Sequence, residues 1–333
     1  MIFKIVSTKN AKSYILGHTV KLENSYLKKG KILNKDDISL LVKNKINSIY
    51  VAIKSDNDYS ENYSAKSIAM HISSNNLYEP EVNNGRADLF SNKNGMLKIN
   101  KEELLKINSL FPEIAVCTLK NFSIVKKGQL VGNVKILPYA VNKKKIEKIL
   151  KNKAFKKIFQ VSEKSIERVG IIFTSNNKKN LKKEKILQAV NLRLKNFHLQ
   201  VNFTKVCQHN HKMLSLTINK ILKKNIELIL IYGETSISDF HDVVPRGIVD
   251  SKGKVLSSIL PTDPGNLLLI GSILNTVIIG VPGCAKSLKR NGFDDILERV
   301  CHGEKFNKIK LAELAEGGLY KNIIRKFKIN KDL

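Results

Sequence analysis

Three glycine-containing turns, each directly after an apolar run, decide how this chain is expected to fold. They lie in ILIYGETSISDFHDVVP (residues 229–245), LPTDPGN (260–266) and VIIGVPGCAKS (277–287). In α/β proteins the strands of a sheet end in such turns, and ligands bind in the crevice outside the carboxyl ends of the strands. We therefore expect the stretch 228–293 to hold a ligand site at one edge of a sheet.

Strands and helices alternate on both sides of these turns, from residue 168 onward. Apolar runs predict strands at 169–177, 199–207, 226–232, 255–260, 267–274 and 276–281, and helical periodicity predicts helices at 181–197, 213–224, 239–249 and 294–302. Repeated strand–helix–strand units imply a mostly parallel sheet. We expect residues 165–305 to form a three-layer α/β domain with helices on both faces of the sheet.

The first 142 residues are expected to form a smaller, partly antiparallel α+β region. Runs of strand character open the chain, and Lys127–Gly128 is expected to be a hairpin turn. Residues 143–164 are rich in Lys with a helical period and predict a linker helix. Residues 306–333 predict a basic C-terminal tail with one further helix at 320–327.

The net charge is strongly positive, at +29 from 58 basic and 29 acidic residues. Only seven of the 58 basic residues are Arg, whereas sequence-specific nucleic-acid readers rely on the Arg fork. The Lys residues are spread along the chain, and the joint abundance of Lys, Asn and Ile is what an A/T-rich genome produces. We therefore disfavour a nucleic-acid partner and expect the charge to attract an anionic substrate.

The cysteine and hydropathy patterns indicate a cytoplasmic protein. The four Cys stand far apart without a CxxC pair, which argues against a disulfide framework and for a reducing compartment. The chain opens without a long apolar signal region. Its longest apolar stretch, 267–281, is interrupted by Gly271, Ser272, Asn275 and Thr276 and is too short and too polar to span a bilayer.

The first strand of the C-terminal domain ends in four small polar residues, Thr174-Ser175-Asn176-Asn177. Hydroxyl and backbone N–H groups just before a helix suit an anionic group. Thr174 and Ser175 are therefore candidate ligand-binding residues. The alternative is an ordinary helix N-cap.

The turn that begins at Gly233 carries the densest set of polar groups. Gly233 lets a ligand approach the backbone closely, and hydroxyl groups come from Thr235, Ser236 and Ser238. Asp239 and Asp242 are three residues apart, so on a helix they share one face. Two carboxylates on one face can hold a divalent metal or activate a hydroxyl group. The alternative is that Asp239 caps the helix while Asp242 is solvated.

The third turn resembles a phosphate-binding turn. Gly283 is a candidate for a positive φ, and Lys286 and Ser287 then stand at the start of the next segment. Lys289 and Arg290 add positive charge nearby. The spacing is not that of the GxxxxGK[ST] nucleotide loop.

Two further patterns bear on chemistry. Cys207-x-His209-x-His211 has a spacing that could bind a metal, but the two His stand at a strand-to-helix junction without an adjoining acidic residue, so we disfavour a metal role. Cys284 could be a nucleophile, but no His lies close to it in sequence, and we expect an inert thiol.

Together these turns resemble the molybdopterin-binding domain shared by molybdopterin adenylyltransferases and molybdopterin molybdotransferases. That family has a glycine-rich turn followed by one or two Asp, and here the turn reads GETSISDFHDVVP (233–245). The two Pro-Gly turns of the molybdotransferases look like DPGNL (263–267) and VPGCA (281–285). The resemblance covers about residues 168–302, with three motifs in order.

The N-terminal region carries a resemblance of its own. ILGHTVKLENSYLKKGKILNKDDISLLVKNKINSIYVA (15–52) is similar to the opening of molybdotransferase-like proteins. The whole chain looks most like the molybdopterin-binding half of bacterial proteins that often continue into a nucleotidyltransferase domain. We expect this chain to lack that domain.

The resemblance implies a protein of molybdenum cofactor biosynthesis that binds molybdopterin. It implies adenylyl transfer to the pterin phosphate, with ATP, or molybdate insertion with release of AMP. Asp242 and Asp239 would then be the catalytic residues and would hold Mg²⁺. The ligand would be bound by Thr174, Ser175, Gly233, Thr235, Ser236, Ser238, Pro264, Gly265, Pro282, Gly283, Lys286 and Ser287. Relatives assemble through such domains, so a homo-oligomer and contacts with other cofactor-biosynthesis proteins are expected.

Three departures from the family pattern leave alternatives open. Glu234 replaces the second Gly of the glycine-rich turn, Asp263 replaces a Lys, and Cys284-Ala285 replaces Asn-Pro. Glu234 and Asp263 would put negative charge beside an anionic ligand, which favours a non-catalytic molybdopterin carrier or chaperone. A nucleotide-acting hydrolase of a related domain type and a nucleic-acid binder are the remaining alternatives.

Overall fold

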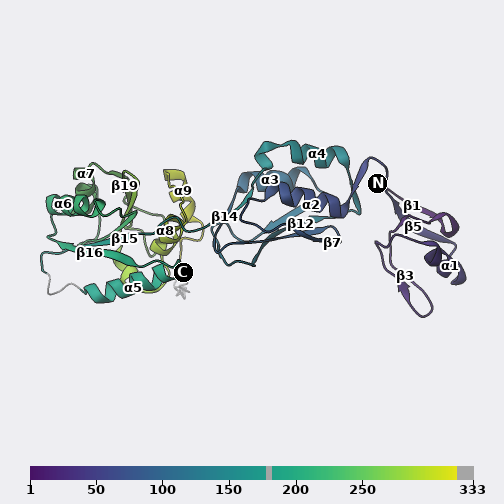
Figure 1. Cartoon of the computed structure of the whole chain (residues 1–333), viewed down its shortest axis with the longest axis horizontal. Coiled ribbons are helices and arrows are strands. Elements are labelled where there is room, and N and C mark those ends of the chain that lie inside the picture. The colour runs from purple at the N-terminus through teal and green to yellow at the C-terminus, as the bar shows by residue number, and fades with distance from the viewer. Residues whose placement is uncertain (178–181, 321–333) are drawn as a thin grey trace, which may run out of the picture. The chain divides into compact units, whose positions relative to one another are not determined.

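The computed structural model describes residues 1–177 and 182–320, and it divides the chain into two compact units (Figure 1). The first unit is Met1–Glu163 and the second is Lys164–Leu333. The N-terminal region was expected to end at residue 142 and to be the smaller part. Instead, the first unit is nearly as long as the second.

The first unit begins with a small antiparallel sheet. Its strand order is β1-β5-β2, with β1 Ile2–Ser7, β5 Ser48–Ile53 and β2 Ile15–Leu16. A separate hairpin joins β3 Val20–Lys21 to β4 Tyr26–Leu27, and helix α1 spans Lys35–Lys43. Asn34 caps α1 by accepting a hydrogen bond from the Asp37 N–H, and Asp37 completes a capping box. These two hydrogen bonds fix the start of the helix.

The rest of the first unit is an antiparallel α+β structure, as predicted. One sheet has the order β10-β12-β8-β7 (Ile114–Thr118, Leu130–Ile136, Arg86–Phe90, Glu81–Asn83). A second has the order β11-β9-β14 (Ile124–Val125, Gly95–Ile99, Phe159–Ser162), and β6 (Asp58–Ser60) pairs with β13 (Ala140–Asn142). Helices α2 (Glu61–Ile72), α3 (Lys101–Leu110) and α4 (Lys143–Lys151) lie on one side of the strands (Figure 1).

The segment 143–164 differs from the linker helix that was expected. The helix α4 stops at Lys151, and Ile146 and Ile149 are fully buried in the core of the first unit. Farther along, β14 pairs with β9 of the same unit. The Lys residues of this segment misled the prediction because a Lys-rich helix can still bury a narrow apolar stripe.

The second unit is a mixed α/β structure built on a six-stranded, mostly parallel sheet, which confirms the predicted fold class at that level. The strand order is β16-β15-β17-β20-β19-β18. The strands are β16 Val201–Cys207, β15 Val169–Thr174, β17 Leu228–Tyr232, β20 Thr276–Gly280, β19 Leu269–Ile273 and β18 Lys254–Ser257. The first four strands run parallel, and β19 and β18 are antiparallel to their neighbours.

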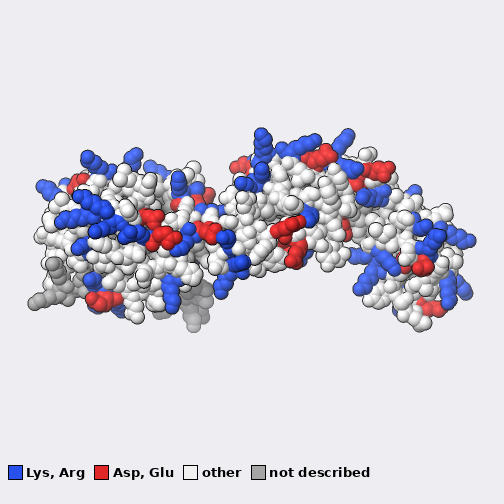
Figure 2. Space-filling model, viewed as in Figure 1, with Lys and Arg blue, Asp and Glu red and all other residues white. Residues whose placement is uncertain are grey.

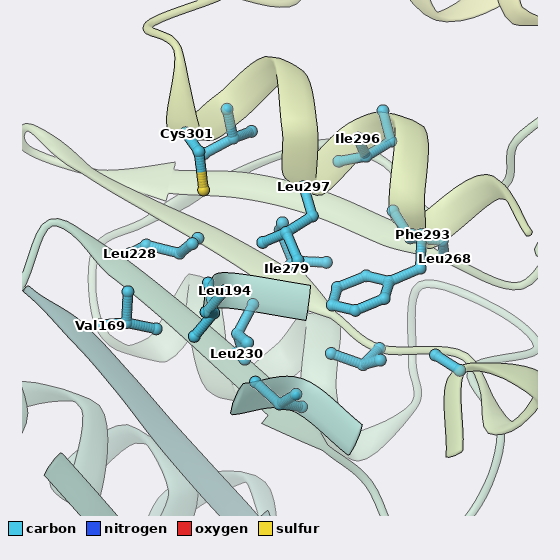
Figure 3. Packing of buried hydrophobic residues seen from close by; sticks show 14 of the residues in the cluster. Val169, Leu194, Leu228, Leu230, Leu268, Ile279, Phe293, Ile296, Leu297 and Cys301 are labelled. Carbon is cyan, nitrogen blue, oxygen red and sulfur yellow. The ribbon is translucent and has the colours of Figure 1, made fainter. Parts of the chain in front are cut away.

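Helices pack against both faces of this sheet because its strands are apolar on both sides. On one face, Leu194 of α5 (Lys183–Lys195) and Phe293 of α8 (Gly292–Cys301) pack with Leu230 of β17 (Figure 3). On the other, α6 (His211–Leu222) and α7 (Val243–Asp250) pack against Ile229 and Ile231 of the same strand. In the described residues, no helix combines the length and the hydrophobicity needed to cross a membrane.

The segment after residue 305, expected to be a basic tail, is part of the folded unit over its described length. It forms α9 (Lys308–Ala312), and Leu311 and Leu314 are buried in the main core. Farther on, Tyr320 N donates a hydrogen bond to Asp263 O at 2.9 Å. The free energy gained by burying these apolar side chains outweighs the effect of the positive charge in this segment. The helix expected at 320–327 lies, beyond Tyr320, outside the described residues.

The turn 260–266 supports the start of α8 through close backbone contact. Gly292 N donates a hydrogen bond to Pro264 O at 3.0 Å. Gly265 has φ +123°, and a Cβ atom at this position would lie 2.6 Å from Gly292 N. Only glycine satisfies both the backbone angle and the contact.

We predict that Gly265→Ala lowers the free energy of unfolding by about 1–3 kcal/mol, through backbone strain and steric conflict. Urea denaturation of the two proteins measures the difference. Gly283→Ala is the matched control, because Gly283 does not have a left-handed φ and a Cβ there meets no atom within 4 Å. The control should change stability by less than about 1 kcal/mol. Equal losses in both variants would contradict the assignment.

Candidate functional site

Parallel pairing brings three strand ends to one edge of the six-stranded sheet. Phe173 of β15 pairs with Tyr232 of β17, and Ile231 of β17 pairs with Gly280 of β20. The segments that follow, 174–177, 233–242 and 281–287, therefore leave the sheet at the same edge. We call this region the strand-end edge. The sequence analysis singled out each of these segments, 174–177 as a polar strand end and the other two as glycine-containing turns.

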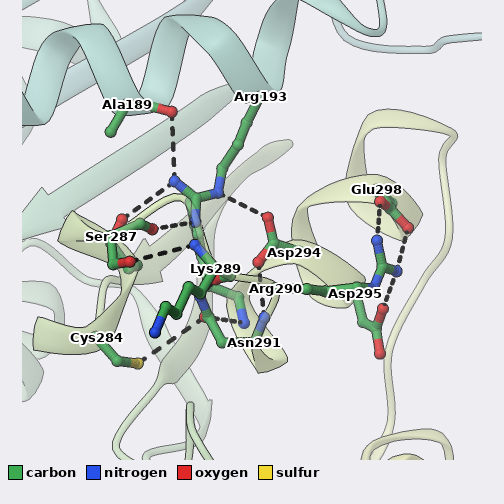
Figure 4. Close-up of polar contacts among 12 residues, drawn as sticks. Ala189, Arg193, Cys284, Ser287, Lys289, Arg290, Asn291, Asp294, Asp295 and Glu298 are labelled. Carbon is green, nitrogen blue, oxygen red and sulfur yellow. Dashed lines mark hydrogen bonds and ion pairs between the residues drawn. The ribbon is translucent and has the colours of Figure 1, made fainter. Parts of the chain in front are cut away.

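Arg193, which lies on α5, fixes the third turn through hydrogen bonds to its backbone. The Arg193 guanidinium donates to the carbonyl oxygens of Ala285 (3.2 Å) and Ser287 (2.6 Å), and its Nε lies 2.7 Å from Asp294 Oδ1 on α8 (Figure 4). The Arg193 side chain is only 7% exposed. The other carboxylate oxygen of Asp294 accepts from the N–H of Asn291, the N-cap of α8. One buried ion pair thus joins α5, the third turn and α8.

Sequence reasoning missed Arg193. A signal was present, because Arg193 lies seven residues after Ile186 on the apolar face of the predicted helix. A cation on that face must be paired when it is buried. Its partners could not be read from the sequence, because Asp294 lies 101 positions away.

A cavity of about 640 Å³ opens between α5 and the third turn. Three of its lining residues are lysines, Lys182, Lys185 and Lys286, and none is acidic. The rest of the lining is Ile186, Gln188, Ala189, Leu192, Gly283, Cys284, Ser287 and Leu288. We call it the lysine cavity. It brings together Gly283, Lys286 and Ser287, which the sequence singled out.

Three details of this turn differ from or extend the sequence-based prediction. The turn is a short 3-10 helix, Gly283–Lys286, and Pro282 precedes it as the N-cap. Gly283 was expected to have a positive φ and does not. The reason is that this helical turn needs no left-handed residue. Burial raises the pKa of the Cys284 thiol, which disfavours the reactive thiolate.

The second turn does not contribute to this cavity. Pro264 and Gly265 contact the start of α8, as described above, and neither is among the residues that line the cavity. In this structure their contacts are those of packing residues. A site role for them stays a prediction.

In the turn 174–177, the hydrogen-bond donors that were expected to face a ligand anion are engaged by the chain's own Glu234. Glu234 Oε2 accepts a hydrogen bond from Asn176 N at 3.0 Å, and Glu234 Oε1 lies 3.2 Å from Ser175 Oγ. The hydrogen bonds from the Asn176 N–H and then the Ser175 hydroxyl hold the pKa of the Glu234 carboxyl below its usual range. The carboxylate therefore stays ionised where a ligand anion was expected.

His209 links the turn 174–177 to the turn after β17. Its Nδ1 lies 2.8 Å from Thr174 Oγ1, and its Nε2 lies 3.1 Å from Thr235 Oγ1. Thr174 is fully buried, and its Oγ1 already accepts from Glu234 N at 3.3 Å. A buried hydroxyl proton needs an acceptor, and His209 Nδ1 is the acceptor within hydrogen-bond distance of Thr174 Oγ1. We infer that the neutral form of the His209 ring carries its proton on Nε2, which it donates to Thr235.

The aspartates expected to be catalytic do not lie on a shared helical face. α7 begins at Val243, four residues later than predicted, so Asp239 precedes the helix and Asp242 is its N-cap residue. Asp242 Oδ2 accepts from Asp239 N at 3.1 Å and from Ser238 N. Asp239 Oδ1 accepts from His241 N. The carboxylates bind the backbone of their own turn because Asp readily closes such turns.

The magnesium site expected at Asp239 and Asp242 does not fit this arrangement. Each carboxylate already accepts backbone hydrogen bonds. Across residues 1–177 and 182–320, no cluster of three or more His, Cys, Asp or Glu could hold a metal ion. Among the predicted ligand-binding residues of the same turn, Gly233 is half-buried, and the hydroxyl-bearing Ser236 and Ser238 are exposed.

Comparison with known proteins places the chain near one group of solved structures, at low similarity. No protein-family model and no curated protein matches the sequence. A molybdopterin biosynthesis MoeA protein from Pyrococcus horikosii is 11% identical, covering 90% of this chain and 75% of that one, with a TM-score of 0.31. A molybdopterin biosynthesis Mog protein from Mycobacterium ulcerans is 17% identical, covering 40% and 92%, with a TM-score of 0.30.

The molybdopterin biosynthesis enzyme MoaB from Thermus thermophilus is similar at the same level. It is 15% identical, covering 47% of this chain and 100% of that one, with a TM-score of 0.31. The solved structures named here are thus proteins of molybdopterin biosynthesis. At these scores the likeness carries no functional argument.

We predict that Arg193→Gln lowers the free energy of unfolding by about 3–5 kcal/mol, because it leaves a buried carboxylate unpaired. Arg290→Gln is the matched control. Arg290 also contacts acidic residues of α8, Asp295 and Glu298, but its side chain is 54% exposed. The control should lose about 1 kcal/mol or less. Chemical denaturation compares them, and similar losses would refute the role of the buried pair.

We also predict that the His209 ring carries its proton on Nε2 in the neutral wild-type protein. In Thr174→Val the donor to Nδ1 is lost, so the two neutral tautomers should become mixed. Nitrogen chemical shifts of the labelled imidazole report the tautomer directly. The ring of the exposed His241 serves as the internal reference. A protonated Nδ1 in the neutral wild-type ring would show that the hydrogen-bond assignment is wrong.

Proposed function

We propose that the C-terminal unit binds molybdopterin and acts in molybdenum cofactor biosynthesis. The observation that carries the proposal is the lysine cavity at the strand-end edge. A ligand with a flat ring and a phosphate needs an apolar wall for the ring and cationic donors for the phosphate. Ile186, Ala189 and Leu192 of α5 would form the wall, and the three lysines would bind the phosphate.

The backbone of the third turn supports this assignment. A Cβ at Gly283 would meet no atom within 4 Å, so the space beside it is open to a ligand. The carbonyl oxygens of Ala285 and Ser287 accept hydrogen bonds from Arg193. These acceptors are therefore turned away from an incoming anion. In this proposal Ser287 and Lys286 contact the phosphate, and the exposed hydroxyls of Thr235, Ser236 and Ser238 meet the ligand's polar groups.

The reaction we propose is adenylyl transfer to the pterin phosphate or molybdate insertion with release of AMP. Either reaction brings together two anionic partners, which the surrounding lysines favour. Asp242 and Asp239 stay the candidate catalytic residues of this proposal. Their carboxylates would first have to leave the backbone N–H groups that they now accept from.

A second candidate function is a non-catalytic molybdopterin carrier. The observation that favours it is the engagement of Asp239, Asp242 and Glu234 in contacts within the chain. A carrier needs the cavity and its lysines but no free carboxylate. Homo-oligomers and contacts with other cofactor-biosynthesis proteins fit either function.

Nucleic-acid binding is not favoured by the visible charge distribution. Figure 2 shows Lys and Arg spread over this face of each unit, with Asp and Glu between them. A nucleic-acid surface instead gathers its cations in a patch or stripe. The lysine cavity, at about 640 Å³, is of a size for a small-molecule anion.

We predict that the purified protein binds oxidised molybdopterin, followed by pterin fluorescence in equilibrium dialysis. Lys286→Glu should raise the Kd at least about tenfold, because it replaces a charge-assisted contact by repulsion. Lys220→Glu, an exposed residue of α6 outside the cavity, should bind as the wild type does. Unchanged affinity in Lys286→Glu would contradict the cavity as the site.

The same preparation separates the enzyme from the carrier. The protein is incubated with molybdopterin, Mg-ATP and molybdate, and AMP or adenylylated pterin is measured by chromatography. Turnover would support the transferase. Bound pterin without such products would support the carrier, and neither binding nor turnover would refute both.

A further inference from the structure

The turn 174–177 has the donors of an anion site, and a carboxylate from another turn fills them. Asn176 offers its backbone N–H and Ser175 its hydroxyl. Both contact Glu234, which lies 58 positions farther along the chain from Asn176. A carboxylate bound this way resembles a bound phosphate in charge and in hydrogen bonding.

The surrounding contacts hold Glu234 in this position. Its own N–H donates to Thr174 Oγ1, a fully buried atom at the end of β15. The side-chain oxygen of Asn176 accepts from His209 N at 3.3 Å, which fixes the turn on its other side. The Glu234 side chain itself is exposed. The carboxylate is therefore accessible to solvent while its backbone is fixed.

We infer that Glu234 is a specificity-determining residue that keeps ligand anions out of the 174–177 turn. A phosphate that enters this turn must displace the carboxylate or lie beside it, and two anions at that distance repel each other. The ligand's phosphate is thereby directed to the lysine cavity alone. The site accepts a pterin with one phosphate group and rejects ligands that present a second anionic group to this turn. This inference rests on the proposed function for the ligand's identity.

The test uses inorganic phosphate and pyrophosphate as probes, with amide chemical shifts of Asn176 and Asn177 as the readout. The wild-type amides should not show saturable shifts with either probe. In Glu234→Ala both amides should show saturable shifts, with an apparent Kd at least about tenfold lower than the apparent Kd of any wild-type response. Glu234→Gln keeps the side-chain shape but loses the charge, and it should also bind phosphate more tightly than the wild type.

Glu316→Ala is the control for the loss of one negative charge from the same unit. Glu316 is exposed and lies on the C-terminal segment, so its removal should leave the amides of the turn unresponsive. Dispersed amide spectra show that each variant is folded. The inference is overturned if the wild type titrates like Glu234→Ala. It is also overturned if neither Glu234 variant responds.

This test and the test of the proposed function can fail separately. Phosphate binding at Asn176 is measured without any pterin, so the role of Glu234 stands or falls on that readout. Pterin affinity in Lys286→Glu is measured at the cavity, away from Glu234. If the protein does not bind pterin but the Glu234 variants bind phosphate at Asn176, the proposed identity of the ligand is refuted. The exclusion of anions by Glu234 would still stand.

Discussion

The parallel pairing of β15, β17 and β20 is the constraint on which the rest of the site depends. Because the three strands run in one direction, their carboxyl ends meet at one edge. Turns that lie more than 50 positions apart in the sequence become neighbours there, as the contact of Asn176 with Glu234 shows. A change that shifted the register of one strand would remove its turn from the site.

Two side-chain interactions then give the edge its chemistry. The buried Arg193–Asp294 pair fixes the third turn and the start of α8, so the lysine cavity has a rigid wall. Glu234, in contrast, fills an anion position in the turn 174–177 with the chain's own charge. One edge of the sheet thus has a part open to anions and a part closed to them. We propose that this asymmetry makes the site selective for how many anionic groups a ligand presents.

The sheet and its edge could be predicted from the sequence, because both follow from local periodicity and turn composition. The α7 boundary could not, because Asp239 and Asp242 can close a turn as readily as they can start a helix. The burial of Ile146 within a Lys-rich helix and the packing of Leu311 depend on neighbours that are distant in sequence. The partners of Arg193 and Glu234 could not be predicted for the same reason, because they too are distant in sequence. The residue types indicated that the edge binds anions. Only the folded structure shows which hydrogen-bond donors are already engaged by other groups of the chain.

The most direct measurement of the central claim is to map where a pterin phosphate binds. Oxidised molybdopterin is titrated into the isotope-labelled full chain, and amide shifts are followed across the described residues. Our account predicts saturable shifts at Gly283, Cys284 and Lys286 and along the cavity-facing side of α5, with Asn176 unaffected. Shifts confined to the first unit, or a saturable response centred on Asn176, would contradict it.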